Sequence, residues 1–546
     1  MVFAHPVSAL RYWQEHASEQ VFLRQPQGDI FIEHTWAEVA DEARRIASAL
    51  KAMGFEPGER IAILAKNSAH WFIADFAIML AGYVSVPIYA SASSETIHYV
   101  LKHSETRAIF VGALDHWADQ EKGIESDVVR IAMVTETMPA ALQWSQLVKN
   151  NQPIPYPDAL DPNAKMSIVY TSGSTGEPKG VVMSFAGYAK ASYHLIEQLD
   201  IQGCERTVSY LPLAHITERV YIQGTALFSG SISVSFVESL ARFNANLQAI
   251  KPTLFLSVPR LWLKFQQGIW QKMPPKKLDF LLKVPFLNRI VKNKIKVALG
   301  LEEARLLGCG SAAVSTELLR WYARLDINIC QAWGMSETLA YGTLNVPFNS
   351  KHIDSVGRTG SAAEIKVSEQ GELLFKSDAM LTKYYLQPEL TRQLYTKDGF
   401  IHTGDKAEVD DEGFVRITGR LKDMFKTAKG KYVMPVPIEA KFEDSSLVEQ
   451  VCVAGDGLAQ PVALLILSEL AKEMDKVTLG KKLAELLEHI NERLESHERL
   501  AHLLILSDAW TPENGLLTPT LKIRRHKLEA KYKALFTQAD EQIAWY

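Results

Sequence analysis

The sequence predicts an α/β protein with a large multi-sheet N-terminal domain and a small α+β C-terminal domain, joined by a hinge. Three observations support this prediction. The chain has 546 residues, more than one hydrophobic core usually supports. Helical and strand patterns alternate through roughly the first 400 residues, as in α/β folds. After Gly371 the pattern changes to short hairpins.

The N-terminal part opens with a helix signal. Thr35 and Glu38 have the spacing of a capping box, and the apolar periodicity that follows continues to Met53, with Gly54 as a stop. Short apolar runs then predict buried strands. These runs lie at residues 61–64, 108–111, 168–170, 232–236, 254–258 and 306–307.

Residues 71–88 form the most apolar stretch of the chain. Asp75, Gly82 and Pro87 interrupt it, so we interpret it as a helix that runs into a strand rather than as a membrane span. The N-terminus lacks the basic and apolar regions of a secretory signal. We therefore expect a cytoplasmic protein.

The C-terminal part contains a different pattern. Asp411, Glu412 and Gly413 separate two strand-like runs and predict a hairpin turn. Strands are expected near residues 451–454, 462–467 and 503–506, a long helix from about Leu479, and a basic helix at the end. Placing the boundary at residues 420–422 gives domains 1–420 and 421–546.

Composition excludes some classes of function. The formal net charge of −4 argues against a nucleic-acid-binding protein, whose domain is usually strongly basic. The four cysteines lie far apart and show neither the spacing of a zinc site nor that of a disulfide framework.

The strongest motif follows the strand expected at residues 168–170. Residues 170–180 have the sequence YTSGSTGEPKG. Small residues let backbone N–H groups approach phosphate oxygens, hydroxyls add donors, and Lys179 adds a positive charge. A Walker A loop is excluded because Glu-Pro separates Gly176 from Lys179, and Gly180 stands where Ser or Thr is required. A Gly/Ser/Thr surface turn is the plain alternative.

Further motifs follow in order along the chain: LPLAH (211–215), QAWGMSE (331–337), HTGD (402–405), GRLKD (419–423) and PTLKI (519–523). Together with the 170–180 segment they resemble the adenylate-forming superfamily of acyl- and aryl-CoA synthetases, firefly luciferase and the adenylation domains of peptide synthetases. The resemblance extends from about Trp36 to Lys531. It implies an enzyme that converts a carboxylic acid and ATP into an acyl-adenylate and pyrophosphate, and then passes the acyl group to coenzyme A.

The resemblance also implies the residues of the nucleotide site. Glu337 and Thr175 would bind Mg²⁺, and Ser336 would contact phosphate. Asp405 would accept hydrogen bonds from ribose, with Arg420 as a second ribose contact; alone, either would be taken for a turn former or a surface charge. The ATP/AMP contacts implied are Thr171, Ser172, Gly173, Ser174, Thr175, Gly176, Lys179, Ser311, Ala312, Gln331, Ala332, Trp333, Gly334, Met335, Asp405 and Arg420. Trp333 matches the residue on which adenine stacks.

Lys522 matches the family's catalytic lysine, which approaches both the carboxylate and the α-phosphate. The match has a departure, because Leu521 stands where the family usually has glycine, and a solvated basic helix is the alternative. Ala313 likewise replaces a usual proline after the Gly310–Ala312 turn. Lys422 matches the hinge between the domains.

His215 and Gly310 match positions in the acyl pocket of the family. A histidine between apolar residues is more often a packed core residue, so His215 is expected as a wall or gate of the pocket rather than a general base. No base is required in the first step, because a carboxylic acid is already ionised at neutral pH.

The LPLAHITERV and GKYVMPVPIE segments look like the long-chain branch of the acyl-CoA synthetases, which makes a fatty acid the expected substrate beside ATP and coenzyme A. Residues 264–296 carry nine Lys or Arg residues against one acidic residue, Asp279, interleaved with apolar side chains. This composition suits peripheral contact with an anionic membrane, or else an amphipathic helix with a basic outer face. Two alternatives remain: an acyl-AMP ligase that serves an acyl carrier protein, and a non-catalytic lipid-binding relative.

Overall fold

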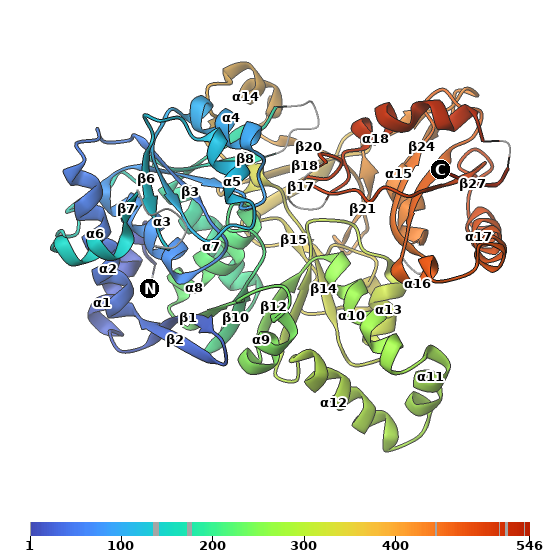
Figure 1. Cartoon of the computed structure of the whole chain (residues 1–546), viewed down its shortest axis with the longest axis horizontal. Helices are drawn as coiled ribbons and strands as arrows, with labels where there is room; N and C mark the ends of the chain where they lie inside the picture. The colour runs from blue at the N-terminus through green and yellow to red at the C-terminus, as the bar shows by residue number, and fades with distance from the viewer. Residues whose placement is uncertain are drawn as a thin grey trace.

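The computed structural model describes residues 2–134, 141–171, 177–442, 445–512, 514–518, 522–539 and 541–546. These residues form a large N-terminal domain built mainly on two extended sheets and a smaller C-terminal domain beside it, seen at the red end of the chain in Figure 1. The mixed α/β class and the division into a large and a small domain agree with the sequence prediction.

The first large sheet has nine strands among the described residues, mostly parallel in its central part. In spatial order they are β16 (Arg358–Thr359), β15 (Thr343–Leu344), β14 (Ile329–Trp333), β13 (Leu306–Cys309), β12 (Leu254–Ser257), β10 (Glu205–Ser209), β11 (Ile232–Phe236), β1 (Val21–Gln27) and β2 (Ile30–Thr35).

The second large sheet has eight strands in the same described ranges. In spatial order they are β19 (Lys383–Tyr384), β9 (Lys179–Ser184), β8 (Lys165–Thr171), β4 (Val84–Ile88), β3 (Arg60–Leu64), β5 (Thr106–Val111), β6 (Val129–Ala132) and β7 (Leu142–Gln143). The strands expected from short apolar runs are thus confirmed, with bounds that differ by a few residues. Their continuous hydrophobicity reflects burial on both faces.

Helices fill the space between the two sheets. Helix α3 (Ala69–Ala81) contacts β3 of one sheet and β1 of the other, and all but His70 of its residues are buried. A helix buried all round must be apolar all round, which explains why this stretch looked like a membrane-span candidate. It ends at Gly82 in the left-handed conformation and leads into β4, as predicted. In the described part of the chain no helix combines the length and apolarity needed to cross a membrane.

The other helices of the N-terminal domain cover the sheets or join α3 between them. The Thr35 capping box is present and starts α2 (Trp36–Ala52) as expected. The remaining helices are α1 (Pro6–His16), α4 (Ser94–Ser104), α5 (Trp117–Gln120), α6 (Trp144–Asn150), α7 (Phe185–Gln198), α8 (Thr225–Ser229), α9 (Phe243–Ile250), α10 (Pro259–Lys272), α11 (Pro275–Lys283), α12 (Leu287–Leu299), α13 (Thr316–Ala323) and α14 (Pro388–Leu394). Short helical turns are η1 (Glu121–Gly123), η2 (Glu218–Gly224), η3 (Ser336–Thr338) and η4 (Ser350–His352).

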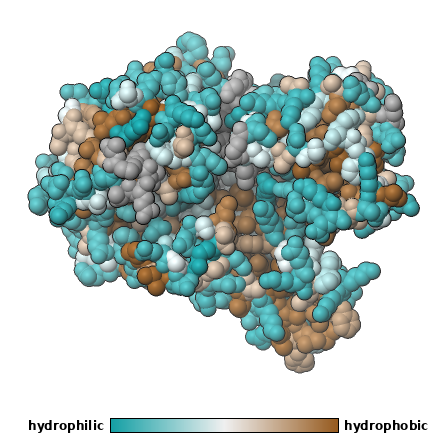
Figure 2. Space-filling view, in the orientation of Figure 1, coloured by the Kyte–Doolittle hydropathy of each residue, from teal (hydrophilic) through white to brown (hydrophobic). Residues whose placement is uncertain are grey.

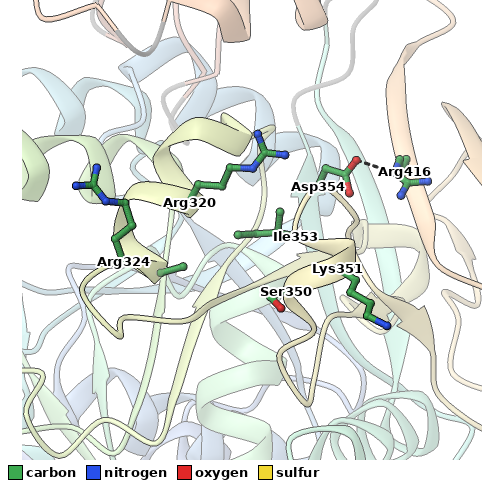
Figure 3. Close-up of a pocket in the computed structure, with 8 residues that line it drawn as sticks. Arg320, Arg324, Ser350, Lys351, Ile353, Asp354 and Arg416 are labelled. Carbon is green, nitrogen blue, oxygen red and sulfur yellow. Dashed lines mark hydrogen bonds and ion pairs between the residues drawn. The ribbon is translucent and has the colours of Figure 1, made fainter. Parts of the chain in front are cut away.

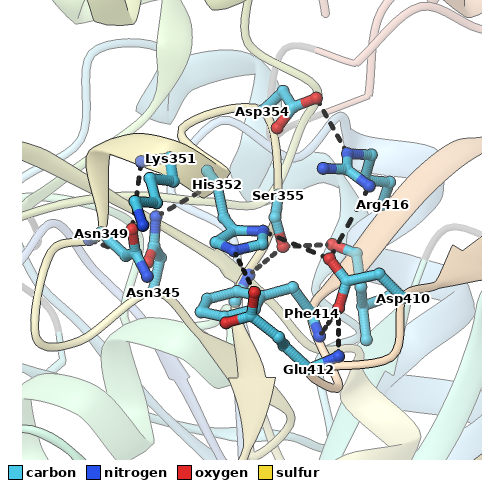
Figure 4. Close-up of polar contacts among 12 residues, drawn as sticks. Asn345, Asn349, Lys351, His352, Asp354, Ser355, Asp410, Glu412, Phe414 and Arg416 are labelled. Carbon is cyan, nitrogen blue, oxygen red and sulfur yellow. Dashed lines mark hydrogen bonds and ion pairs between the residues drawn. The ribbon is translucent and has the colours of Figure 1, made fainter.

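A small antiparallel sheet connects the two domains. Its strands are β17 (Ala363–Val367), β18 (Glu372–Ser377), β20 (Ile401–Val409) and β21 (Val415–Arg420). The predicted hairpin turn lies between β20 and β21. His352 packs flat against Phe414 at 3.8 Å between ring centroids and makes an ion pair with Asp410, so the turn is held against the first large sheet (Figure 4).

The C-terminal domain has its own core, a four-stranded sheet and a separate two-stranded sheet. The two-stranded sheet contains β22 (Phe425–Lys426) and β23 (Tyr432–Val433). The four-stranded sheet contains β24 (Val448–Ala454), β25 (Val462–Leu467), β26 (Leu503–Leu506) and β27 (Ile543–Trp545). The helices are α15 (Pro435–Glu439), α16 (Glu469–Lys472), α17 (Lys476–Asn491) and α18 (Arg525–Tyr532), and the short turns are η5 (Ala440–Phe442) and η6 (Lys533–Thr537). An ion pair of 2.8 Å joins Arg260 of α10 to Glu449 of β24, so the two domains are in contact.

Candidate functional site

The carboxyl ends of parallel strands meet at one edge of the first large sheet. Strands β12, β13 and β14 are neighbours and run parallel, so Ser257, Gly310 and Trp333 come together where they end. All three line a small pocket, which also includes Ser311, Ala332, Gly334, Leu211, Thr217, Leu256, Ala340 and Tyr221. This edge is where ligands bind in open α/β sheets.

Gly310 and Ser311 form the turn that follows β13. The Cβ of any other residue at 310 would lie 3.3 Å from the Ala332 carbonyl oxygen, closer than side chains usually pack. Ser311 has φ of +67°, a left-handed conformation that costs free energy in a residue other than glycine. Ala312 is exposed beside it. Strained backbone at a pocket wall is typical of functional sites.

The phosphate motif begins and ends on a β-ladder. Thr171 at the end of β8 pairs with Lys179 at the start of β9, so the two ends of the motif lie side by side. The Tyr99 hydroxyl donates to the Pro178 carbonyl oxygen at 3.1 Å and fixes the second end. Ser172, Gly173, Ser174, Thr175 and Gly176 lie outside the described residues.

Glu337, Lys179 and Lys422 gather near this ladder. The Tyr384 hydroxyl donates to Glu337 Oε1 at 2.5 Å, and the Lys179 ammonium lies 5.7 Å from the Tyr384 ring centroid. Burial and the neighbouring Lys422 cation lower the pKa of Lys179, while Glu337 acts in the opposite direction. Two cations and one carboxylate at the end of a phosphate motif can bind a polyphosphate.

Glu337 suits the Mg²⁺ that the resemblance implies. Mg²⁺ is usually held by one or two carboxylates, with phosphate oxygens and water completing its shell. Among the described residues, no three His, Cys, Asp or Glu side chains gather into a metal site, so the ion would share its shell with the phosphates. Tyr384 orients this carboxylate, a role that was not identified from the sequence. No sequence pattern marked Tyr384, because the strand that carries it, β19, has only two residues.

A buried carboxylate is hydrogen-bonded to Trp333, one of the residues that line the pocket. Asp405 is 4% exposed and accepts a hydrogen bond from Trp333 Nε1 at 2.8 Å through Oδ2. Arg420 lies 3.0 Å from Oδ1, directly across the β20–β21 ladder. The structure thus brings Trp333, Asp405 and Arg420 together. Trp333 is largely buried, and its N–H orients the carboxylate.

Glu372 supports the irregular part of β20 that carries Asp405. Its Oε1 accepts the backbone N–H of Gly404 at 2.9 Å, and its Oε2 lies 2.8 Å from His402 Nδ1. Gly404 itself has φ of +71°, a conformation that glycine adopts readily, at the point where the pairing of β20 with β18 is irregular. This carboxylate was not identified from the sequence, because it is more than thirty residues from the HTGD motif whose shape it fixes.

Lys522 enters the site from the C-terminal domain. Its backbone N–H donates to Thr518 Oγ1 at 3.0 Å, and Ile523 forms a β-bridge with Leu517. Three residues further on, Arg525 is fixed by the Glu439 carboxylate of α15 at 2.6 Å. Burial and the Arg420 cation lower the pKa of Lys522 to about 8, although Asp405 opposes them. A lysine from the C-terminal domain is therefore close enough to Asp405 and Arg420 of the N-terminal domain to be influenced by their charges.

His215 lies at the same meeting point. Burial and the charge of Lys522 lower the pKa of His215 to about 3, so its imidazole is neutral at physiological pH. The backbone N–H of Thr217 points at its Nδ1 at 3.3 Å, which makes that nitrogen the acceptor. His215 is therefore an uncharged, buried side chain close to Lys522, and its expected role as a wall or gate of the acyl pocket stays a prediction.

A π-helical turn, η2, follows His215 and lies between the sheets. It carries Arg219, which makes an ion pair of 2.8 Å with Asp75 of α3, both side chains being 0% exposed. Gln223 also donates to Asp75, at 3.1 Å. Tyr221 of the same turn lines the pocket. Single π-helical turns are frequent at functional sites, and composition alone did not predict this one.

Other expected contacts have different surroundings. Gln331 donates its amide N–H to the Ile353 carbonyl oxygen at 2.8 Å and so supports a loop of the first sheet. Ser336 is largely buried in η3, and Met335 is partly buried beside it.

A second hollow lies between α13, η4 and β21 (Figure 3). Its arginines are paired: Arg416 with Asp354 at 2.8 Å, and Arg320 with Glu317 at 3.2 Å. Arg324, also in its lining, pairs with Asp279. The arginines of this hollow therefore already have carboxylate partners.

Two cations and a carboxylate beside the phosphate motif, a buried carboxylate hydrogen-bonded to Trp333 of the first pocket, and a lysine contributed by a second domain suit a reaction between a nucleoside triphosphate and an acid. Adenylate-forming ligases are the class that this arrangement defines. The model of the family described as "AMP-binding enzyme" matches residues 11–385, and that of the "AMP-binding enzyme C-terminal domain" matches residues 422–542. The chain belongs to the AMP-binding enzyme family and is an adenylate-forming ligase.

Curated relatives match along most of the chain. The long-chain-fatty-acid–CoA ligase ACSBG2 of Xenopus laevis is 28% identical over 97% of this chain and 83% of its own length. The long-chain-fatty-acid–CoA ligase FadD15 of Mycobacterium bovis is 27% identical over 92% of this chain and 91% of its own.

Solved structures share the fold. The adenylation domain of a carboxylic acid reductase from Segniliparus rugosus, in complex with AMP and a co-purified carboxylic acid, has a TM-score of 0.82 at 20% identity, with 98% of this chain and 94% of that chain covered. O-succinylbenzoate coenzyme A synthetase from Bacillus subtilis, in complex with ATP and magnesium, has a TM-score of 0.75 at 20% identity, covering 95% and 99%.

Proposed function

We propose that this ligase activates a long- or medium-chain fatty acid with ATP and joins it to coenzyme A, releasing AMP and pyrophosphate. The observation that carries the proposal is the meeting of Lys522, from the C-terminal domain, with Asp405 and His215 of the N-terminal domain. Fatty acid as the substrate is supported by the relatives, which are long-chain-fatty-acid–CoA ligases.

In the first half-reaction a fatty-acid carboxylate oxygen attacks the α-phosphorus of ATP, and the bond to the β-phosphate oxygen breaks. Both reactants are anionic, so their approach needs positive charge. Lys522 supplies it at the reacting atoms and Lys179 at the departing pyrophosphate. Asp405 holds the ribose. Mg²⁺, bound at Glu337, would neutralise charge on the phosphates.

In the second half-reaction the thiolate of coenzyme A attacks the acyl carbonyl, and AMP leaves. Lys522 has no role in this step, because the α-phosphate bond is no longer being formed. We propose that the small domain turns about Lys422 between the steps and withdraws Lys522 from the site. The domains proposed are accordingly 1–420 and 421–546. The thiol of an acyl carrier protein could replace that of coenzyme A with the same first half-reaction.

The test is acyl-thioester formation with ATP and Mg²⁺ across free acids from acetate to oleate, with coenzyme A and, separately, with an acyl carrier protein. Stoichiometric acyl-CoA that is maximal with a medium or long chain supports the proposal. Turnover with the carrier protein alone would make this an acyl-AMP ligase for that acceptor. Failure with every acid and both acceptors would leave the non-catalytic lipid-binding relative.

A further inference from the structure

Helices α10, α11 and α12 form an arm (residues 259–299) that extends away from the body of the N-terminal domain. In Figure 1 it projects at the lower right, and in Figure 2 its far end is covered by hydrophobic side chains. Several large apolar side chains of the arm are exposed. They are Phe280 at 66% exposed, Phe286 at 88%, and, at lower exposures, Leu287, Ile290 and Val297.

Helix α12 carries more apolar surface than its packing uses. Its inner stripe, at i and i+4 spacing, is Val291, Ile295 and Leu299, all buried in the core beneath the arm. Ile290 and Val297, two turns apart on the opposite face, form an exposed outer stripe, and Leu287 is partly exposed where the helix begins. An amphipathic helix that only covered the domain would need the inner stripe alone.

Phe286 stands at the turn between α11 and α12. Its backbone φ is +65°, a conformation that is unfavourable for a bulky residue. Strain of this kind persists only where the surrounding structure enforces it. Here it presents an aromatic ring to the outside, where the described residues leave it almost fully exposed.

Positive charge surrounds these apolar side chains. Residues 264–296 carry nine Lys or Arg and one acidic residue, a formal excess of 9 − 1 = 8 positive charges on a chain whose net charge is −4. On α11, Lys276, Phe280 and Lys283 are spaced i, i+4 and i+7 and share one face. The one acid, Asp279, pairs with Arg324 at the end of α13, and Lys292 is the one of the nine cations that pairs with a carboxylate of the domain body, Asp326, at 3.0 Å among the described residues.

The arm is also joined directly to the candidate site. Helix α10 begins at Pro259, two residues after β12 ends at Ser257, and Ser257 lines the pocket. The first helix of the arm therefore starts at the edge of the pocket.

We propose that this arm is a membrane-docking element that inserts Phe280, Phe286 and the outer stripe of α12 into an anionic bilayer, with its lysines on the headgroups. Apolar side chains at the tip and cations around them are the two components of interfacial binding. An acidic protein partner would satisfy the cations but would not account for two exposed phenylalanines, one of them on strained backbone. The proposal does not depend on acyl chain length or on the acceptor.

The test is flotation of the full-length protein with vesicles of phosphatidylcholine alone or with added phosphatidylglycerol. Binding is expected only with the anionic lipid and is expected to weaken at high salt. Phe280→Ser with Phe286→Ser should lower the partition coefficient by at least about tenfold, because each ring loses its burial in the bilayer. Lys276→Gln, Lys277→Gln and Lys283→Gln together should lower it by roughly a hundredfold. Leu240→Ser, at an exposed apolar residue of another surface loop, is the matched control and should bind as the wild type does.

Phe286→Trp provides a direct readout, since its fluorescence should shift to the blue on anionic vesicles. Turnover of a water-soluble short acid should be unchanged in all of these variants. The proposal is overturned if the wild type does not float with anionic vesicles. It is equally overturned if the serine variant binds them normally, or if loss of the lysines lowers turnover with an acidic carrier protein while leaving vesicle binding intact.

Discussion

Replacing Lys522 with alanine should stop the first half-reaction and spare the second. The structure places this ammonium group beside the carboxylate that would hold the ribose, and buries it enough to lower the pKa of Lys522 to about 8. Two unit charges about 4 Å apart at an effective dielectric constant of about 20 interact by about 4 kcal/mol. That energy corresponds to about a thousandfold in rate. Loss of a single donor to a developing oxyanion costs a similar factor, about 10²–10³.

The assay is single-turnover formation of acyl-AMP from ATP and a fatty acid, compared with the conversion of supplied acyl-AMP and coenzyme A to acyl-CoA. Lys522→Ala should slow the first by about 10³ and the second by less than about threefold. Lys527→Ala, at an exposed lysine of the same segment, is the matched control and should slow neither. Equal losses in both steps would refute the reasoning, because they would indicate damage to the domain rather than loss of a charge at the α-phosphate.

Three further predictions follow from the geometry. Lys522 acts as a cation, and its pKa is lowered to about 8, so kcat/KM for adenylation should fall as the pH rises above about 8. A kcat/KM that stays constant to pH 10, or the same fall in the Lys522→Ala variant, would contradict this prediction. Tyr384→Phe removes the hydroxyl that orients Glu337 and should raise the Mg²⁺ concentration for half-maximal rate about tenfold, with an unchanged unfolding midpoint as the control. Arg219→Met leaves the buried Asp75 carboxylate without its counter-charge, with the Gln223 amide as its remaining donor, and should lower the free energy of unfolding, measured in urea, by about 3–5 kcal/mol. The double variant with Asp75→Leu should lose less, and an equal or larger loss in it contradicts the assignment.

Much of the fold could be predicted because its signals are local. The Thr35 capping box involves residues three apart, and buried strands such as β3 and β11 are short apolar runs with few alternatives. The Gly82 helix stop has a local signal as well, since glycine tolerates the left-handed conformation found there.

The pairings that form the site could not be predicted, because they join distant segments. Arg219 and Asp75 are 144 residues apart, and Tyr384 is 47 residues from Glu337. From the sequence, Asp75 was only an interruption in an apolar run, whereas it is the partner of a buried arginine. Lys522 was expected from a motif with an atypical Leu521, and what the structure adds is its position beside Asp405.

The arm, too, could be predicted only in part from the sequence. Its basic, apolar composition was evident in the sequence, and two interpretations were left open. Composition does not reveal which apolar residues face the core. The separation of α12 into a buried stripe through Val291 and an exposed stripe through Ile290 depends on how that helix packs.

The central claim is that this chain forms an acyl-adenylate, and acid-dependent exchange of labelled pyrophosphate into ATP measures that reaction directly. Exchange should require Mg²⁺ and a fatty acid, should proceed without coenzyme A, and should be lost in Lys522→Ala and kept in Lys527→Ala. Absence of exchange with every fatty acid, or exchange that persists at the wild-type rate in Lys522→Ala, would contradict the account.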